Sequence, residues 1–191
     1  MSSLILASAS PRRQEILRSR GYLFRVHPAT VDEIDEDVFP GRVPLRNAQA
    51  KAAAVATLFP SDLVLGADTV IECERQILGK PSDLADARRI LSLLSGRTHE
   101  VVTAVALLRL VDHTRCVFCA RTAVTFHPLS AAVIDDYLTR VNVLDKAGAY
   151  AIQEYGEMLV ANIDGPLDNV IGLPGDKTAA ALARCRVRPG A

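Results

Sequence analysis

Short apolar runs alternate with helical patterns along most of this sequence. This alternation is typical of a domain in which helices cover a β-sheet. Ser10 and Pro11 are suited to begin the first helix, and the apolar run 62–73 is suited to a buried strand. Two further runs, 101–110 and 116–126, are expected to form an antiparallel hairpin. We therefore predict an α/β fold with a mixed, twisted sheet flanked by helices, in two lobes around a cleft.

The expected elements follow one another with few long gaps, and the sequence has no internal repeat or linker. One domain over residues 1–186 and a short tail at 187–191 are therefore predicted. Strands are expected at 4–7, 22–26, 62–73, 76–78, 101–110, 116–126 and 149–153. Helices are expected at 10–21, 44–59, 82–94, 130–140 and 174–185, the third of them capped by Ser82.

The composition excludes several classes of protein. The 22 basic and 22 acidic residues cancel, and 49% of the residues are hydrophobic, which excludes a disordered chain and a strongly basic nucleic-acid binder. No apolar stretch reaches the roughly 20 residues of a membrane helix. At the start of the chain the apolar stretch precedes the positive charges, which is the wrong order for a signal peptide. A cytoplasmic protein that binds neither nucleic acid nor membranes is expected.

Cys116 and Cys119 have the spacing of a metal or redox pair, and His113 and His127 flank them. There is no second pair to complete a four-ligand zinc site. The segment also reads as a strand, in which an offset of three sends the two thiols to opposite faces. Buried, reduced cysteines are the favoured interpretation.

Arg12 and Arg13 lie in the first turn of the first expected helix, where the helix dipole disfavours cations. Two guanidinium groups beside the free N–H groups of a helix start form a site for a phosphate. A solvated basic turn is the alternative interpretation, above all for Arg12.

Asp68 stands in the middle of the apolar run LVLGADTVI. A buried carboxylate is costly unless it is paired, hydrogen-bonded or bound to a metal. Gly66 and Ala67 leave space beside it for a ligand or another backbone. Glu33, in the acidic loop 31–41, can supply a second oxygen ligand for a hard divalent cation. The alternative is that Asp68 pairs with an internal arginine.

Lysine is rare here, since 18 of the 22 basic residues are arginine. Lys80 follows the expected strand pair and is suited to act as a point charge on a phosphate. Lys51 lies at the edge of an apolar helix face, where it either faces the same cleft or extends along the surface to water. Neither the P-loop nor the dinucleotide fingerprint occurs. The residues thus indicate an enzyme that acts on a phosphate ester with a divalent metal, without naming the substrate.

A series of motifs in the chain resembles one known family, the Maf nucleoside triphosphate pyrophosphatases. The motifs occur in the same order over nearly the whole chain, which is far more specific than any one of them. They are LASASPRR (6–13), GADTV (66–70), GKP (79–81), LSGRTH (94–99), DKAGAYAIQ (145–153), IDG (163–165) and NVIGLP (169–174).

The resemblance implies a fold like that of inosine triphosphate pyrophosphatase, with a nucleotide in the cleft. It implies hydrolysis of a nucleoside triphosphate to the monophosphate and pyrophosphate with Mg²⁺ or Mn²⁺, in a cytoplasmic homodimer. Asp68 matches the catalytic aspartate, which accepts the proton of the attacking water and holds the metal, and Glu33, the expected second metal ligand, matches a residue of the polar pocket. The implied substrate-binding residues are Ser8, Ser10, Arg12, Arg13, Lys51, Thr69, Lys80 and Gln153, of which Arg12, Thr69 and Gln153 match positions linked to base preference.

The combination of GADT with AIQ resembles the branch of the family that prefers dTTP and UTP. Two features depart from the pattern: Glu154 stands where glycine is usual, and Pro166-Leu167-Asp168 replaces a more aromatic or serine-bearing stretch. Glu154 places a charged side chain near the expected base site.

Two other classes of function remain open from the sequence. One is a non-catalytic nucleotide-binding regulator of cell division and septum formation. The other is a nucleotidyltransferase, which requires an acceptor other than water.

Overall fold

The computed structural model describes residues 3–35 and 39–190, and over these residues the predicted mixed α/β fold is confirmed. Three short 3₁₀ turns, η1 (Pro40–Arg42), η2 (Ala147–Ala149) and η3 (Gly156–Met158), join some of the elements. The strands are β1 (Leu4–Leu6), β2 (Phe24–Val26), β3 (Leu63–Cys73), β4 (Gln76–Leu78), β5 (Thr98–Arg109), β6 (Thr114–Phe126) and β7 (Val160–Asp164). The helices are α1 (Pro11–Ser19), α2 (Val43–Leu58), α3 (Leu84–Leu94), α4 (Ala131–Arg140), α5 (Leu167–Ile171) and α6 (Gly175–Arg184).

Within the described residues, the seven strands form one sheet in the order β2-β1-β3-β5-β6-β7, with β4 paired to β3. β1 runs parallel to both β2 and β3, so that Leu4 lies opposite Phe24 on one side and Leu63 on the other. The pairs β3–β4 and β6–β7 are antiparallel. Parallel β1 and β2 are linked through α1, as a parallel pair requires, and antiparallel β3 and β4 by a short turn. Antiparallel β6 and β7 are instead joined by the long segment 127–159, which contains α4.

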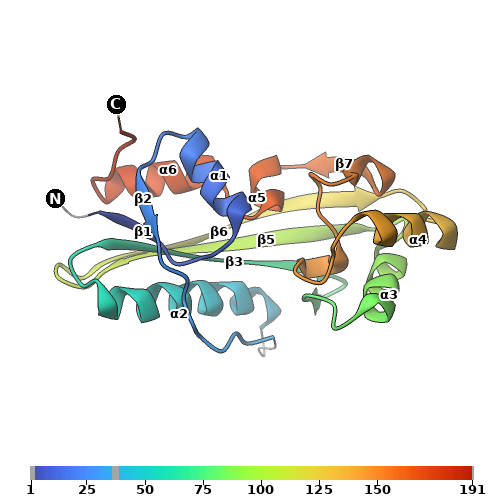
Figure 1. Cartoon of the computed structure of the whole chain (residues 1–191), viewed down its shortest axis with the longest axis horizontal. Helices are drawn as coiled ribbons and strands as arrows, with labels where there is room; N and C mark the ends of the chain where they lie inside the picture. Colours follow the sequence, from blue (N-terminus) through green and yellow to red (C-terminus); the bar gives the residue numbers. More distant parts are fainter. Residues whose placement is uncertain (1–2, 36–38, 191) are drawn as a thin grey trace. The chain divides into compact units, whose positions relative to one another are not determined.

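The described residues divide into two compact units, and β3, β5 and β6 contribute residues to both. The first unit comprises residues up to 68, then 103–120 and 172 onward. In it, α2 covers one face of the strands and α1 and α6 cover the other (Figure 1). Small residues of α2, among them Ala48 and Ala52, pack against Ile5 and Val64, which lets this helix lie close to the strands.

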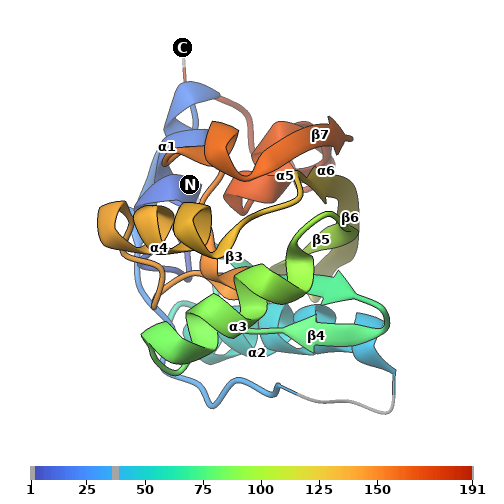
Figure 2. The same ribbon diagram turned by 90° about the vertical axis from the view of Figure 1, so that its right-hand side faces the viewer.

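The second unit comprises residues 69–102 and 121–171 and has a core of its own. Helices α3 and α4 contact each other in this unit (Figure 2). Leu91, Leu94, Phe126 and Tyr137 are fully buried in its core. The prediction that residues 1–186 form a single domain stays a prediction.

The helix boundaries follow the capping rules. Ser10 caps α1 as predicted, accepting a hydrogen bond from the Arg13 N–H, and Gly21 leaves the helix with a positive φ of 75°. The cap of α3 is Asp83, whose side chain accepts from the Asp86 N–H, so the prediction that Ser82 caps this helix is wrong. Asp83 is favoured because its carboxylate also suits the positive end of the helix dipole.

The strand predicted at 149–153 is also wrong. Gly148 and Ala149 both have positive φ, and the chain continues through turns to η3. The strand in this part of the chain is β7, in which Ile163 pairs with Val124 of β6. Its sequence, VANID, is short and half polar, which is too weak a pattern to identify an edge strand from propensity.

Three other predictions concern the surface and the cysteines. All four cysteines are free thiols, as expected. Within residues 3–35 and 39–190, no helix combines the length and the apolar character needed to cross a membrane. Part of the predicted acidic loop, residues 36–38, lies outside the described residues.

His99 is a buried histidine of the second unit and is 2% exposed. Its Nε2 shares a hydrogen bond of 2.9 Å with the hydroxyl of Tyr150, and its ring meets Phe126 edge-on. Burial lowers the pKa of His99 from 6.5 to about 4. The imidazole is therefore neutral at physiological pH and serves the core.

This lowered pKa predicts a loss of stability in acid. Between pH 6.5 and pH 4 the unfolded chain binds a proton at His99 that the folded chain does not. The free energy of unfolding should therefore be lower at pH 5 than at pH 7 by about 2 kcal/mol. Urea unfolding at pH 7 and pH 5 measures this. His99→Gln should lose that part of the pH dependence, whereas the exposed control His113→Gln should keep it. Equal pH dependence in the wild type and His99→Gln would contradict the assignment.

Candidate active site

Asp68 is a buried carboxylate, 5% exposed, at the point where β3 leaves the first unit. The apolar residues around it in Leu63–Cys73 build the strand, and the buried pattern continues on both sides of it. A carboxylate in this position must be compensated by hydrogen bonds or opposite charge. Two side chains of α2 provide the hydrogen bond and the positive charge.

Lys51 of α2 bridges two carboxylates. Its Nζ lies 2.7 Å from Asp68 Oδ1 and 3.0 Å from Glu33 Oε1, and its side chain is only 11% exposed. The lysine therefore does not extend to water, and the partner of Asp68 is a lysine instead of the internal arginine considered above. Because both carboxylates reach one ammonium group, Asp68 and Glu33 lie close together.

Asn47 is a member of this cluster that the sequence analysis missed. Its Nδ2 donates to Asp68 Oδ2 at 3.2 Å and to the Ile34 carbonyl at 3.0 Å, while its Oδ1 accepts from the Ile34 N–H at 3.0 Å. It thereby fixes the backbone next to Glu33. The signal available in the sequence is that Asn47 precedes Lys51 by four residues and so shares its helix face.

Gly66 explains why α2 lies so close to β3. A Cβ at residue 66 would lie 2.3 Å from the Ala48 carbonyl oxygen and 2.7 Å from the Ala52 nitrogen. Both distances are too short for a side chain to fit at this position. The space that the sequence left open for a ligand or a backbone is thus taken by the α2 backbone. Asn47 and Lys51 directly precede Ala48 and Ala52 in the helix, so this contact brings both side chains to Asp68.

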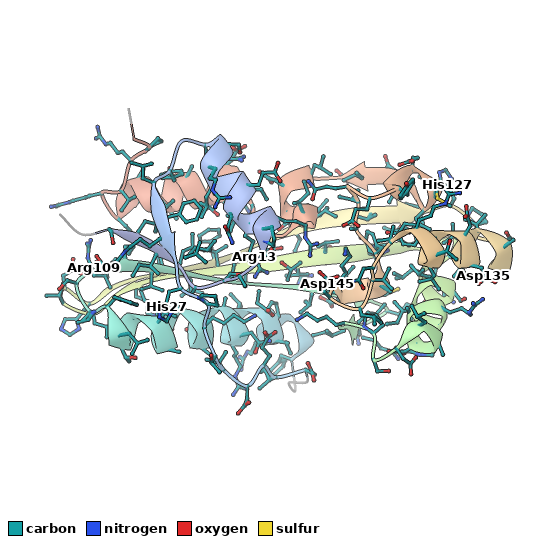
Figure 3. All side chains as sticks on the ribbon, in the orientation of Figure 1. Arg13, His27, Arg109, His127, Asp135 and Asp145 are labelled. Carbon is teal, nitrogen blue, oxygen red and sulfur yellow. The ribbon has the colours of Figure 1, made fainter. Side chains whose placement is uncertain are left out.

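The start of α1 brings further polar groups to the first unit. Arg13, labelled in Figure 3, donates from Nη1 to Ser8 Oγ at 3.2 Å and from Nε to the Gly172 carbonyl at 2.9 Å. Burial lowers the pKa of the Arg13 guanidinium, and the nearby charges of Asp68 and Glu33 oppose this shift. Arg13 therefore faces the carboxylate cluster and is not part of a solvated turn.

Arg12 differs from Arg13 in its surroundings. It is half-buried, and no acidic side chain among the described residues pairs with it. Together with Arg13 and Lys51 it gives three positive charges beside the negative charges of Asp68 and Glu33. The cluster thus has an excess of positive charge next to a helix start, which is the electrostatic character of an anion site.

Three predicted residues, Thr69, Lys80 and Gln153, belong to the second unit. Thr69 follows Asp68 directly and is half-buried. β4 returns antiparallel along β3 with Leu78 opposite Ile71, so the chain at Lys80 runs back toward Thr69. Lys80 is exposed and has no partner among the described residues, while Gln153 is exposed on the turn that follows Ala151.

No group of three or more His, Cys, Asp or Glu side chains in the described part of the chain has the arrangement of a metal site. The candidate ligands therefore remain the pair Asp68 and Glu33. Cys116 and Cys119 are free thiols of β6, as expected, but they are half-buried, so the prediction that they are buried is wrong for this pair.

Comparison with known proteins agrees with these motifs. The family described as Maf-like protein matches residues 3–185. The chain belongs to the Maf family. This Maf chain is 48% identical over 175 residues to the dTTP/UTP pyrophosphatase of Moorella thermoacetica, covering 91% of this chain and 90% of that one. It is 47% identical over 185 residues to the dTTP/UTP pyrophosphatase of Citrifermentans bemidjiense, with 95% and 94% covered.

Among solved structures, the Maf chain has a more distant likeness to the Staphylococcus aureus Ham1 protein. The TM-score is 0.48 at 17% identity, over 82% of this chain and 90% of that one.

The contact at Gly66 generates a prediction for this Maf chain. In Gly66→Ala the new methyl group must displace α2, which should lower the free energy of unfolding by about 1–3 kcal/mol and separate Lys51 from Asp68. Urea unfolding measures the first effect. Gly79→Ala is the matched control, because a Cβ there meets nothing within 4 Å. Equal losses in the two variants would refute the packing argument.

Proposed function

We propose that this chain hydrolyses nucleoside triphosphates, with dTTP and UTP preferred, to the nucleoside monophosphate and pyrophosphate. The observation that carries the proposal is the buried Asp68, held by Lys51 and Asn47 beside Glu33 and Arg13. Relatives that are 47–48% identical over at least nine-tenths of this chain are named as dTTP/UTP pyrophosphatases, which supports the same reaction here.

In the proposed reaction Asp68 is the proton acceptor. A water molecule attacks the triphosphate, the bond between the α and β phosphates breaks, and the proton of the water passes to an Asp68 carboxylate oxygen. General-base assistance of this kind contributes about 10²–10⁴-fold to the rate. Asn47 and Lys51 fix the two oxygens of Asp68 from one side, which orients the carboxylate before the substrate arrives.

The cationic groups are proposed to bind the triphosphate and to stabilise the charge that develops on the leaving pyrophosphate. Arg12, Arg13, Lys51 and Lys80 supply the charge, and Ser8 and Ser10 supply hydroxyl groups at the start of α1. Thr69, Gln153 and Arg12 are proposed to recognise the base.

A divalent cation, Mg²⁺ or Mn²⁺, is proposed as the cofactor. The donors are of the kind that it prefers: Mg²⁺ typically takes one or two carboxylates together with phosphate oxygens, and Asp68 and Glu33 each have an oxygen within 3.0 Å of the same ammonium group. Asp68 and Glu33 would hold the ion, which when bound supplies charge neutralisation at the phosphates.

We further propose a cytoplasmic homodimer that uses a free nucleotide and binds neither nucleic acid nor membranes. The alternative of a non-catalytic regulator of cell division is less well supported, because the charged groups that catalysis requires are held in a connected cluster around Asp68. Release of pyrophosphate with water as the acceptor would also exclude a nucleotidyltransferase. Light scattering of the purified protein tests the dimer.

The role of Asp68 predicts the effect of Asp68→Asn. The amide has nearly the same shape and can remain near Asn47 and Lys51, but it cannot accept the proton, so turnover should fall by about 10²–10⁴-fold while the fold is retained. Pyrophosphate release from UTP with Mg²⁺ and circular dichroism measure the two effects. Asp164→Asn, which changes an exposed carboxylate of β7, should keep full turnover. Near wild-type turnover in Asp68→Asn would refute the assignment.

The anion site predicts that Arg12→Ala and Lys80→Ala weaken nucleotide binding. Each removes a charged hydrogen-bond donor for a phosphate, so KM should rise about 10- to 100-fold. Steady-state kinetics with UTP measures this. Arg18→Ala removes an exposed arginine of the same helix as Arg12 and should leave KM unchanged. Unchanged KM and kcat in both test variants would contradict the phosphate role.

A further inference from the structure

The side chain proposed to read the base, Gln153, stands on a short turn and has no hydrogen-bond partner among the described residues. The turn is closed by a hydrogen bond of 3.1 Å from the Glu154 N–H to the Ala151 carbonyl. The direction of an unsupported side chain depends on how firmly its backbone is held. What holds residues 151 and 154 therefore decides where the Gln153 amide points.

The first anchor of this turn is Tyr137, which is fully buried. Its hydroxyl accepts from the Ala151 N–H at 3.0 Å and donates to the Ala151 carbonyl at 3.4 Å. Burial, above all, raises the pKa of Tyr137 to about 12, so the hydroxyl keeps its proton for the second bond. The turn is thus fixed on the N-terminal side of Gln153.

The second anchor is the ion pair between Glu154 and Lys146. Lys146 is buried, with a side chain 6% exposed, and its Nζ lies 3.5 Å from Glu154 Oε1. The same ammonium group donates to the Asn142 carbonyl and to Asp145 Oδ1 at 2.9 Å. Figure 3 labels Asp145, one of the two carboxylate partners of Lys146 in the described part of the chain. Glu154, which the sequence places near the expected base site, thus pairs with a buried lysine.

We propose that Glu154 and Lys146 are positioning residues for base recognition: their ion pair fixes the C-terminal side of the turn so that the Gln153 amide is presented to the base. This inference rests on the proposed function, since it assumes that Gln153 reads the base. A glutamine amide carries both a donor and an acceptor, so uracil and cytosine, whose edges differ in donors and acceptors, require different orientations of it. A turn that is held only at Ala151 would allow the Gln153 amide to adopt both orientations.

The test measures binding, so that it does not depend on turnover. Dissociation constants for the non-hydrolysable α,β-methylene analogues of UTP and CTP are measured by calorimetry for the wild type, Glu154→Gln, Gln153→Ala and the double variant. Glu154→Gln should reduce the preference for the UTP analogue about 3- to 10-fold, the range of one hydrogen bond. In the Gln153→Ala background the same change should have no further effect, because Glu154 acts through Gln153.

Two further variants separate this role from a general loss of structure. Glu157→Gln removes an exposed carboxylate close by in the sequence and should leave the preference unchanged. Lys146→Met replaces the buried ammonium by an apolar chain of similar length and should lower the preference as Glu154→Gln does. Because Lys146 keeps Asp145 and the Asn142 carbonyl in Glu154→Gln, this variant is expected to fold, and thermal unfolding verifies that.

The outcomes decide the inference and the proposed function separately. An unchanged preference in Glu154→Gln, or an additive effect in the double variant, overturns the inference. An unchanged preference in Gln153→Ala overturns it as well, since there is then no reading side chain to position. If the wild type releases no pyrophosphate but the preference shifts as expected, the proposed reaction fails and the positioning role stands.

Discussion

The geometry of the carboxylate cluster depends on the contact between α2 and β3 at Gly66. Because residue 66 has no Cβ, the backbone around Ala48 and Ala52 can lie directly on the strand. This places Asn47 and Lys51, which are one helical turn apart, at Asp68 two residues further along β3. Small residues without chemistry of their own thus determine the positions of the charged groups.

The zero net charge of the chain conceals this local arrangement. A buried ammonium shared by two carboxylates seldom stabilises a fold more than apolar residues of the same volume would, because removing the charges from water is costly. The core of the first unit is built from apolar residues such as Ile5, Val64 and the alanines of α2, and these charged residues are not among them. A cluster that adds little to folding is consistent with the proposed role in binding, in which a triphosphate would supply negative charge beside Arg12 and Arg13.

The sequence was sufficient for the fold class and for most strands, because long apolar runs such as Leu63–Cys73 have few alternatives. It failed at 149–153, where positive φ at Gly148 and Ala149 is a tertiary result that local preference does not encode. The position of Asp68 in a buried strand was readable, since a lone carboxylate there demands partners. Which partners it has was not readable, since Asn47 joins the cluster through a helix–strand contact distant in the sequence.

Glu154 shows why a departure from a family pattern does not by itself identify a change of substrate. Taken alone, Glu154 predicts a charged side chain near the base site. In the structure its carboxylate lies 3.5 Å from the buried ammonium group of Lys146, which also pairs with Asp145. A glycine at this position would leave the turn free to adopt several conformations. In the proposed role the glutamate restricts the turn without contacting the residues proposed to bind the phosphates. Base preference can thus change through residues 146 and 154 while the groups around Asp68, which belong to the other unit, keep the same arrangement.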